Sequence, residues 1–129
     1  MATWEDVRQL VQVLPETEER TSGHGDLQWR IKGKLMLWER PLRKGDLEAL
    51  GDRAPDGPVL AAHVPDLGAK EALLASSPEV YFTTPHFDDY PAILVRLQSI
   101  DLDELRELVM EAWMDRAPKR VVKEYLEGR

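Results

Sequence analysis

The sequence contains no cysteine and no long apolar run. The first absence excludes disulfide bonds, cysteine-ligated zinc and a thiol nucleophile, and it is typical of proteins from a reducing compartment. No apolar segment approaches the roughly 18 residues that a membrane-spanning helix needs, so we expect no membrane contact. The first residues also lack the basic and apolar regions of a signal peptide. We therefore expect a cytoplasmic protein.

The sequence motifs of the common enzyme classes are absent as well. There is no Gly-x-Ser-x-Gly elbow, and the glycines lack the spacing of a phosphate-binding loop. Ser76 and Ser77 precede Pro78, where helix capping or turn formation explains them. His63 lies in an apolar stretch, which is typical of a core histidine rather than a general base. The sequence therefore predicts neither catalytic residues nor a cofactor.

The histidines and acidic residues allow one metal-site hypothesis. It combines His86 with Asp88 and Asp89, joined by His24 and Asp26. A metal site needs three or four converging ligands, and side chains at successive loop positions rarely converge unaided. Turn formation and a solvated acidic loop explain these residues more simply, so we predict no metal.

The 129 residues are enough for one domain of ordinary size, with 43% hydrophobic and 32% charged residues. Helical spacing of apolar residues predicts helices at 4–13, 67–76 and 101–116, with a final short helix after Pro118. Strand-like segments lie at 27–40 (a β-hairpin), 59–63, 80–83 and 92–97. This order predicts a single α+β domain spanning 1–129: a mainly antiparallel sheet of about five strands, with helices packed on one face in two layers.

Helix-capping residues support two of these helices. Thr3 can accept a hydrogen bond from the amide of Asp6. Asp101, followed by Glu104, has the spacing of a cap whose two side chains bond reciprocally to the backbone. Both signals place a helix start within a residue or two.

The hairpin leaves one question open. Gly33 suits the turn, where positive φ is favourable for glycine. In the second arm either Leu35 and Leu37 or Met36 and Trp38 face inward, and the sequence alone does not decide between the two pairs.

The most distinctive feature of the sequence is the uneven distribution of its charged residues. The net charge is −7, which argues against a general nucleic-acid binder, yet residues 20–45 carry seven positive and two negative side chains, a local net of +5. A protruding basic hairpin can lie along a phosphate backbone, whereas lysines at hairpin tips also commonly protect exposed sheet edges. We therefore name a candidate DNA-binding surface, to which a second basic segment near residue 120 is added. Its residues are Arg30, Lys32, Lys34, Arg40, Arg43, Lys44, Lys119 and Arg120.

Two other functions remain open on the residues alone. The acidic total and the apolar C-terminal helices also suit an adaptor that binds another protein, as a monomer or a homodimer. A small-molecule pocket is the remaining hypothesis. Its candidate lining is Tyr81, His86, Tyr90, Arg96 and Trp113.

The assembled pattern resembles the MmcQ/YjbR family over nearly the whole chain. The segments that carry the resemblance are LPETEE at 14–19, WRIKGKL at 29–35, YFTTPHFDDYPAILVRL at 81–97, DLDELRELVMEAW at 101–113 and APKR at 117–120. The resemblance implies a compact α+β domain similar to type III secretion chaperones, and DNA binding through two wings. The first wing would be the 27–40 hairpin, and the second the strands of 80–97 with their loop.

Overall fold

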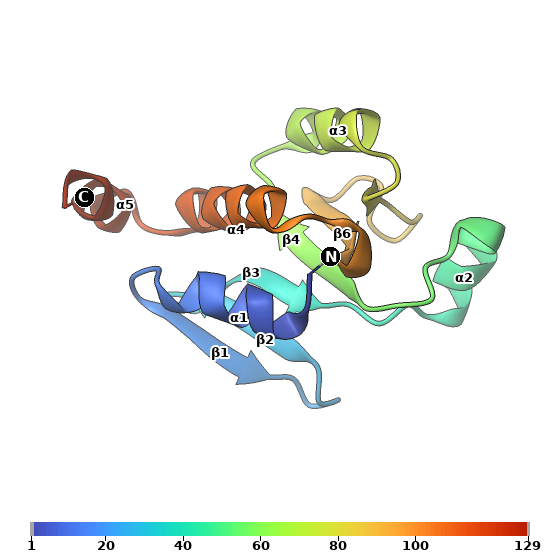
Figure 1. Cartoon of the computed structure of the whole chain (residues 1–129), viewed down its shortest axis with the longest axis horizontal. Helices are drawn as coiled ribbons and strands as arrows, with labels where there is room; N and C mark the ends of the chain where they lie inside the picture. Colours follow the sequence, from blue (N-terminus) through green and yellow to red (C-terminus); the bar gives the residue numbers. More distant parts are fainter. Residues whose placement is uncertain (1, 129) are drawn as a thin grey trace.

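The computed structural model describes residues 2–128, which form a six-stranded sheet and five α-helices (Figure 1). The strands are β1 (Thr17–Thr21), β2 (Leu27–Ile31), β3 (Lys34–Glu39), β4 (Val59–His63), β5 (Tyr81–Phe82) and β6 (Ala92–Arg96). The helices are α1 (Trp4–Gln12), α2 (Lys44–Leu50), α3 (Leu67–Ser76), α4 (Leu102–Arg116) and α5 (Lys119–Glu127). Two short 3₁₀ turns, Gly51–Arg53 and Leu97–Ser99, follow α2 and β6.

The strands form one sheet in the order β1-β2-β3-β4-β6-β5, and every neighbouring pair is antiparallel. This confirms the expected antiparallel α+β architecture. The sheet has one strand more than the sequence predicted, because β1 was not recognised.

The strand β1 was not predicted from the sequence because neither of its sides is buried, so its residues show no hydrophobic pattern. Its residues, TEERT, are all exposed except Thr17, which is partly buried. It pairs on one side only, with Thr17 opposite Ile31 and Thr21 opposite Leu27. An edge strand of this kind shows no alternation of apolar and polar residues, and its charges discourage pairing with another chain.

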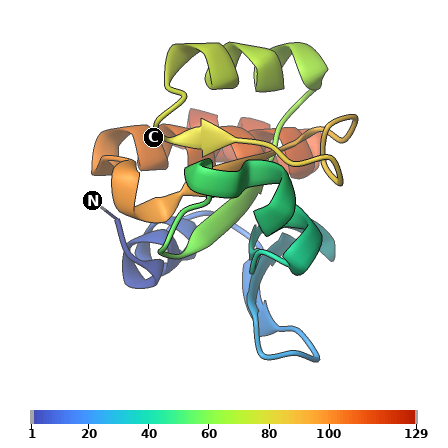
Figure 2. The ribbon, with the colours of Figure 1, turned by 90° about the vertical axis from the view of Figure 1, so that its right-hand side faces the viewer.

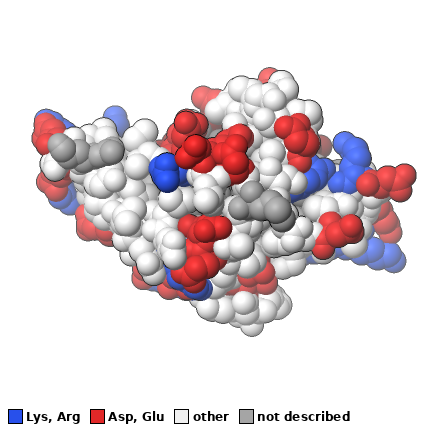
Figure 3. Space-filling model, in the orientation of Figure 1, with Lys and Arg blue, Asp and Glu red and all other residues white. Residues whose placement is uncertain are grey.

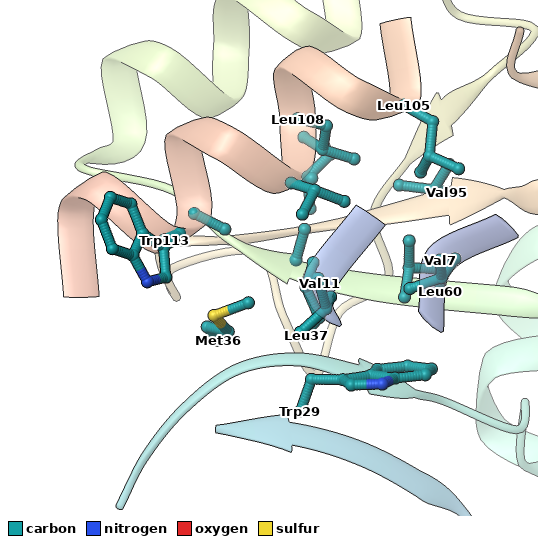
Figure 4. Close-up of a cluster of buried hydrophobic side chains, with 14 of the residues drawn as sticks. Val7, Val11, Trp29, Met36, Leu37, Leu60, Val95, Leu105, Leu108 and Trp113 are labelled. Carbon is teal, nitrogen blue, oxygen red and sulfur yellow. The ribbon is translucent and has the colours of Figure 1, made fainter. Parts of the chain in front are cut away.

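The main hydrophobic core lies between the sheet and the helices α1 and α4 (Figure 4). Val7 and Val11 of α1, and Leu105, Leu108 and Trp113 of α4, pack there against the strands. The strand residues in the same cluster include Trp29, Ile31, Met36, Leu37, Leu60, Ile93 and Val95. The expectation that helices cover one face of the sheet is therefore confirmed for α1 and α4.

The helix caps are local and follow the sequence closely. Thr3 Oγ1 accepts from the Asp6 amide at 3.2 Å, and Asp101 Oδ1 accepts from the Glu104 amide at 2.8 Å. The return bond expected from Glu104 is replaced, because its carboxylate accepts the hydroxyl of Tyr81 instead. Among residues 2–128, no helix has the length and apolar character that a membrane crossing requires.

The β2–β3 hairpin resolves the question that its sequence left open. Lys32 and Gly33 both have positive φ, at 51° and 81°, as a two-residue turn of the I′ kind requires. The register then shifts between Trp29 and Arg30, so that Met36 is the extra residue of a β-bulge. Met36 and Leu37 both enter the main core, and Trp38 faces the other side of the sheet.

A second, smaller cluster covers that other side only near β4, β6 and β5. Its buried members are Leu50, Val59, Ala61, Phe82, Phe87, Ala92 and Leu94. Trp38 packs at the margin of this cluster and stays partly exposed, as do Gln28 and Leu35. The outer face of the β2–β3 hairpin is thus open to solvent.

Candidate functional site

A groove of about 1050 Å³ lies on this open face. Gln28, Leu35 and Trp38 of the hairpin form its floor, and two loops form its sides. One loop joins β1 to β2 and the other joins β5 to β6; in Figure 2 the blue β1–β2 loop extends to the bottom of the view and the yellow-orange β5–β6 loop to the right, while α1 lies at the left. The side and end walls consist of Ser22, His24 and Asp26 from the first loop, His86, Phe87 and Tyr90 from the second, and Glu39, Arg40, Pro41 and Arg43 after β3.

A row of aromatic rings runs from the floor up one wall. The ring centroids of Trp38 and Phe87 are 6.4 Å apart, and those of Phe87 and Tyr90 are 6.2 Å apart. Phe87 is buried at 5% exposure, whereas Tyr90 is 46% exposed. His86 meets the Phe87 ring edge-on at 4.9 Å. Trp38 and Tyr90 therefore present accessible ring surface to the groove, and the buried ring of Phe87 lies next to both.

A buried lysine from α3 holds the aromatic wall in place. Lys70 Nζ donates to the carbonyl oxygens of Phe87 and, at 3.0 Å, of Tyr90. Burial lowers the pKa of Lys70 from its usual value, while Asp88 and Asp89 oppose that shift. The loop also closes on itself, because the Phe87 amide donates to the Thr84 carbonyl at 2.8 Å. These bonds give the wall a defined shape.

Arg40 closes one end of the groove but does not offer its charge to a ligand. Its guanidinium meets Asp46 at 3.2 Å, in a pair whose side chains are 10% and 7% exposed, and it also donates to the Pro41 carbonyl. It lies over the Phe87 ring, 5.2 Å from the centroid. Asp46 in turn accepts the Arg43 amide at 2.9 Å, which begins α2 and leaves the Arg43 side chain exposed at the groove mouth.

His63 contacts Tyr90 of the aromatic wall and is not itself part of the groove lining. Its ring meets Tyr90 edge-on at 5.8 Å, and Nδ1 lies 3.5 Å from Asp115 Oδ2 of α4. Burial is the main cause that lowers the pKa of His63; nearby Arg116 adds to the shift, and Asp115 opposes it. The folded protein therefore disfavours the imidazolium form.

This pKa shift predicts a loss of stability in mild acid. Because the unfolded chain binds the His63 proton more readily, the free energy of unfolding should fall as pH decreases below about 6.5. Thermal unfolding midpoints measured from about pH 7 to pH 5 should drop less for His63→Gln than for the wild-type chain. Equal drops in the two proteins would contradict this assignment.

The candidate DNA-binding cations do not form one continuous patch. Lys32 and Lys34 lie at the turn of the hairpin, whereas Arg40, Arg43 and Lys44 follow the other end of β3, about 20 Å away for a six-residue strand. In Figure 1, α2 and α5 lie at opposite ends of the molecule, so Lys44 is far from the C-terminal basic segment. Figure 3 shows acidic side chains over the centre of the visible face and most cations toward its ends.

Several of these cations already have partners. Lys32 pairs with Glu16 at 2.6 Å, and Arg120 with Glu124 at 3.3 Å. Arg30 donates to the Gly33 carbonyl at 2.9 Å and to the side chain of Gln28. In the described chain, Lys34, Arg43, Lys44 and Lys119 have no carboxylate partner.

The residues proposed for a small-molecule pocket also separate. His86 and Tyr90 line the groove. Tyr81 and Trp113 belong to the main core on the other face, and Arg96 stacks on the Phe82 ring at 4.6 Å. The metal hypothesis finds no cluster within residues 2–128, because no three potential ligands converge there.

Sequence analysis missed Trp38 and Phe87 as site residues. The sequence left open whether Trp38 faces the core, and tryptophans in elements with a buried side generally favour core packing. The bulge at Met36 places both Met36 and Leu37 in the core and turns Trp38 outward, a combination that strict alternation along the strand does not predict. The charged residues near 40–44 were the signal that pointed to this end of the hairpin.

Three comparisons with known proteins bear on this arrangement. The family model that matches the chain is YjbR, over residues 12–114. Uncharacterised proteins of Mycobacterium bovis and of two strains of Mycobacterium tuberculosis are each 50% identical to it over 98% of this chain and 97% of their own length. A crystal structure of a Deinococcus radiodurans protein with the domain DUF419 superposes with a TM-score of 0.67 at 18% identity, covering 88% of this chain and 78% of that one. The last similarity concerns the fold alone.

Proposed function

The chain belongs to the YjbR family, and from that premise we propose that it binds DNA in the groove on the open face of its sheet. The observation that carries the proposal is the composition of the groove: accessible rings of Trp38 and Tyr90 beside the exposed guanidinium of Arg43. Aromatic rings that stack on bases and cations that contact phosphates are the two components of such surfaces. We propose that the protein acts by binding, without catalysis.

The position of the groove further supports this function. Its floor comes from the 27–40 hairpin and its aromatic wall from the loop between β5 and β6. These are the two segments that the family resemblance implies as wings. A ligand in the groove would contact both segments at once, in spite of the acidic total charge.

Charge reversal at the groove mouth should weaken DNA binding. Arg43→Glu with Lys44→Glu removes two unpaired cations near phosphates, and we expect affinity to fall on the order of tenfold at low salt. Fluorescence anisotropy of labelled DNA across a salt series measures the effect. The salt dependence of the variant should also become shallower by about one unit of slope per lost phosphate contact.

Two variants with the same change in charge serve as matched controls. Lys119→Glu with Lys123→Glu lies on α5, and Lys32→Glu with Lys34→Glu lies at the hairpin turn. We expect each to weaken binding much less than the groove variant. If the hairpin-turn variant has the larger effect, the turn rather than the groove contacts DNA. If the wild-type protein binds no DNA at low salt, the proposed function is wrong.

A protein ligand is the second candidate. A smaller hollow of about 300 Å³, lined by Pro41, Pro55 and Pro58, shares Glu39 and Pro41 with the groove, so an extended peptide could occupy both. The acidic total charge favours a basic partner. This candidate would be supported by a bound partner that stays bound after nuclease treatment. The Trp38→Leu variant should lose this binding, and the Trp4→Leu variant should retain it.

A further inference from the structure

We infer that the groove accepts an unpaired nucleic-acid strand, whose bases stack on Trp38 and Tyr90, in preference to a duplex. The inference rests on the proposed function and specifies in addition that the bound nucleic acid is single-stranded. It is carried by three features of the groove: its rings, its scarcity of free positive charge, and the polar group at its floor.

The rings can stack only on bases whose faces are uncovered. The ring centroids of Trp38 and Tyr90 lie 6.4 and 6.2 Å from that of Phe87, and both residues line the groove and are at least partly exposed. In a duplex, each base face is covered by its neighbours in the stack. A single strand has bases that can turn outward onto aromatic side chains. The exposed rings therefore match an unpaired strand.

The groove offers too little free positive charge to hold a duplex by its phosphates. Arg40 is neutralised by Asp46. Arg43 is the one cation of the described lining that has no carboxylate partner, and Asp26 and Glu39 add negative charges to the lining. Duplex binding without ring stacking depends on several phosphate contacts together. The balance of this groove favours stacking over phosphate attraction.

Gln28 places a hydrogen-bonding group next to the rings. It lies opposite Trp38 in the β2–β3 pairing and lines the groove floor. Its amide oxygen accepts from the Arg30 guanidinium at 3.2 and 3.3 Å, which orients the side chain. The amide nitrogen has no partner in the described chain and can donate to the edge of a base. The Watson–Crick edge of a base is accessible to such a donor when the base is unpaired.

The test compares one short fluorescein-labelled DNA strand with the same strand annealed to its complement. Anisotropy measures affinity, and an unlabelled pair of the same DNAs measures quenching of tryptophan fluorescence. We expect the single strand to bind at least tenfold more tightly than the duplex, and to quench the fluorescence of the wild-type protein. The logarithm of its affinity should fall with the logarithm of salt at a shallow slope of about −1 to −2.

Trp38→Leu should lose the quenching and weaken single-strand binding on the order of tenfold. Trp4→Leu is the matched control, because Trp4 is also half-buried but lies with Trp29 on the other face of the sheet. Trp38→Phe keeps an aromatic ring, so it should retain most of the affinity even if the leucine variant folds poorly. The affinity for an RNA strand of the same sequence shows whether binding distinguishes ribose from deoxyribose.

The outcomes separate the inference from the proposed function. Equal affinity for strand and duplex, or unchanged binding by a folded Trp38→Leu variant, would overturn the inference and leave DNA binding intact. Failure of both DNAs to bind would overturn both statements.

Discussion

Replacing Trp113 by alanine is expected to lower the free energy of unfolding by about 3–5 kcal/mol. Trp113 is fully buried between α4 and the sheet (Figure 4). Its ring meets that of Tyr125 at a centroid distance of 5.2 Å. Its indole nitrogen donates to the Pro15 carbonyl at 3.1 Å, which joins α4 to the segment between α1 and β1. Alanine removes the ring contacts, leaves a cavity and leaves that carbonyl without its donor. Urea denaturation followed by circular dichroism measures the change.

Two further variants separate the causes of this loss. Trp113→Phe keeps much of the packing and should be less destabilising than Trp113→Ala. Both variants lose the hydrogen bond to Pro15, so about 1 kcal/mol of the loss in Trp113→Phe should come from that bond. Trp4→Ala removes a half-buried tryptophan and should have a smaller effect than Trp113→Ala. A loss below about 1 kcal/mol for Trp113→Ala would show that α4 does not pack on the sheet as described.

Replacing Asp46 by alanine is the second change with a large expected effect, again about 3–5 kcal/mol. The substitution leaves the Arg40 guanidinium buried without its counter-charge, and the desolvation of that cation is then uncompensated. It also removes the carboxylate that accepts the Arg43 amide at the start of α2. The same denaturation experiment applies. DNA binding should weaken as well, because Arg40 and α2 shape one end of the groove.

The chain offers a matched pair for comparison. Asp103 and Arg106 are 3.3 Å apart but largely exposed, so Asp103→Ala should change stability by less than about 1 kcal/mol. The double variant Asp46→Leu with Arg40→Met replaces the buried pair by apolar groups and should recover much of the lost stability. If Asp46→Ala were as mild as Asp103→Ala, the Arg40–Asp46 pair would not be buried in solution.

These two predictions concern the two faces of one sheet. Trp113 belongs to the side that the helices cover, and its role is to hold the core together. Asp46 belongs to the open side, where a buried ion pair and a buried lysine shape a groove that the helices leave accessible. A protein built in this way can present a binding surface without placing strain on its main core.

Local signals in the sequence predicted most of the fold. Thr3 and Asp101 begin their helices where expected, and Gly33 lies in the hairpin turn. Such signals act over three or four residues, so they are readable from the chain alone. The edge strand β1 was missed because burial, the signal that reveals strands, is almost absent from Thr17–Thr21.

The candidate site was predicted only in part. The basic residues near the hairpin were visible in the sequence, but which of them carry free charge depends on partners far along the chain or on another element. Glu16 neutralises Lys32, and Asp46 neutralises Arg40. Glu104, expected to cap its own helix, bonds Tyr81 across the core instead. Each of these choices is made by side chains that meet only after folding.

The sequence by itself determined the class of fold, the absence of cysteine chemistry and the positions of most helices and strands, because these depend on composition and on short-range periodicity. Tertiary structure alone decided that Trp38 faces outward, that Arg43 rather than Arg40 is the available cation, and that two distant loops enclose one groove. The reason is physical: a β-bulge, a buried ion pair and a lysine bonded to carbonyls of another segment each depend on how separate elements pack together. No pattern within a single segment specifies them.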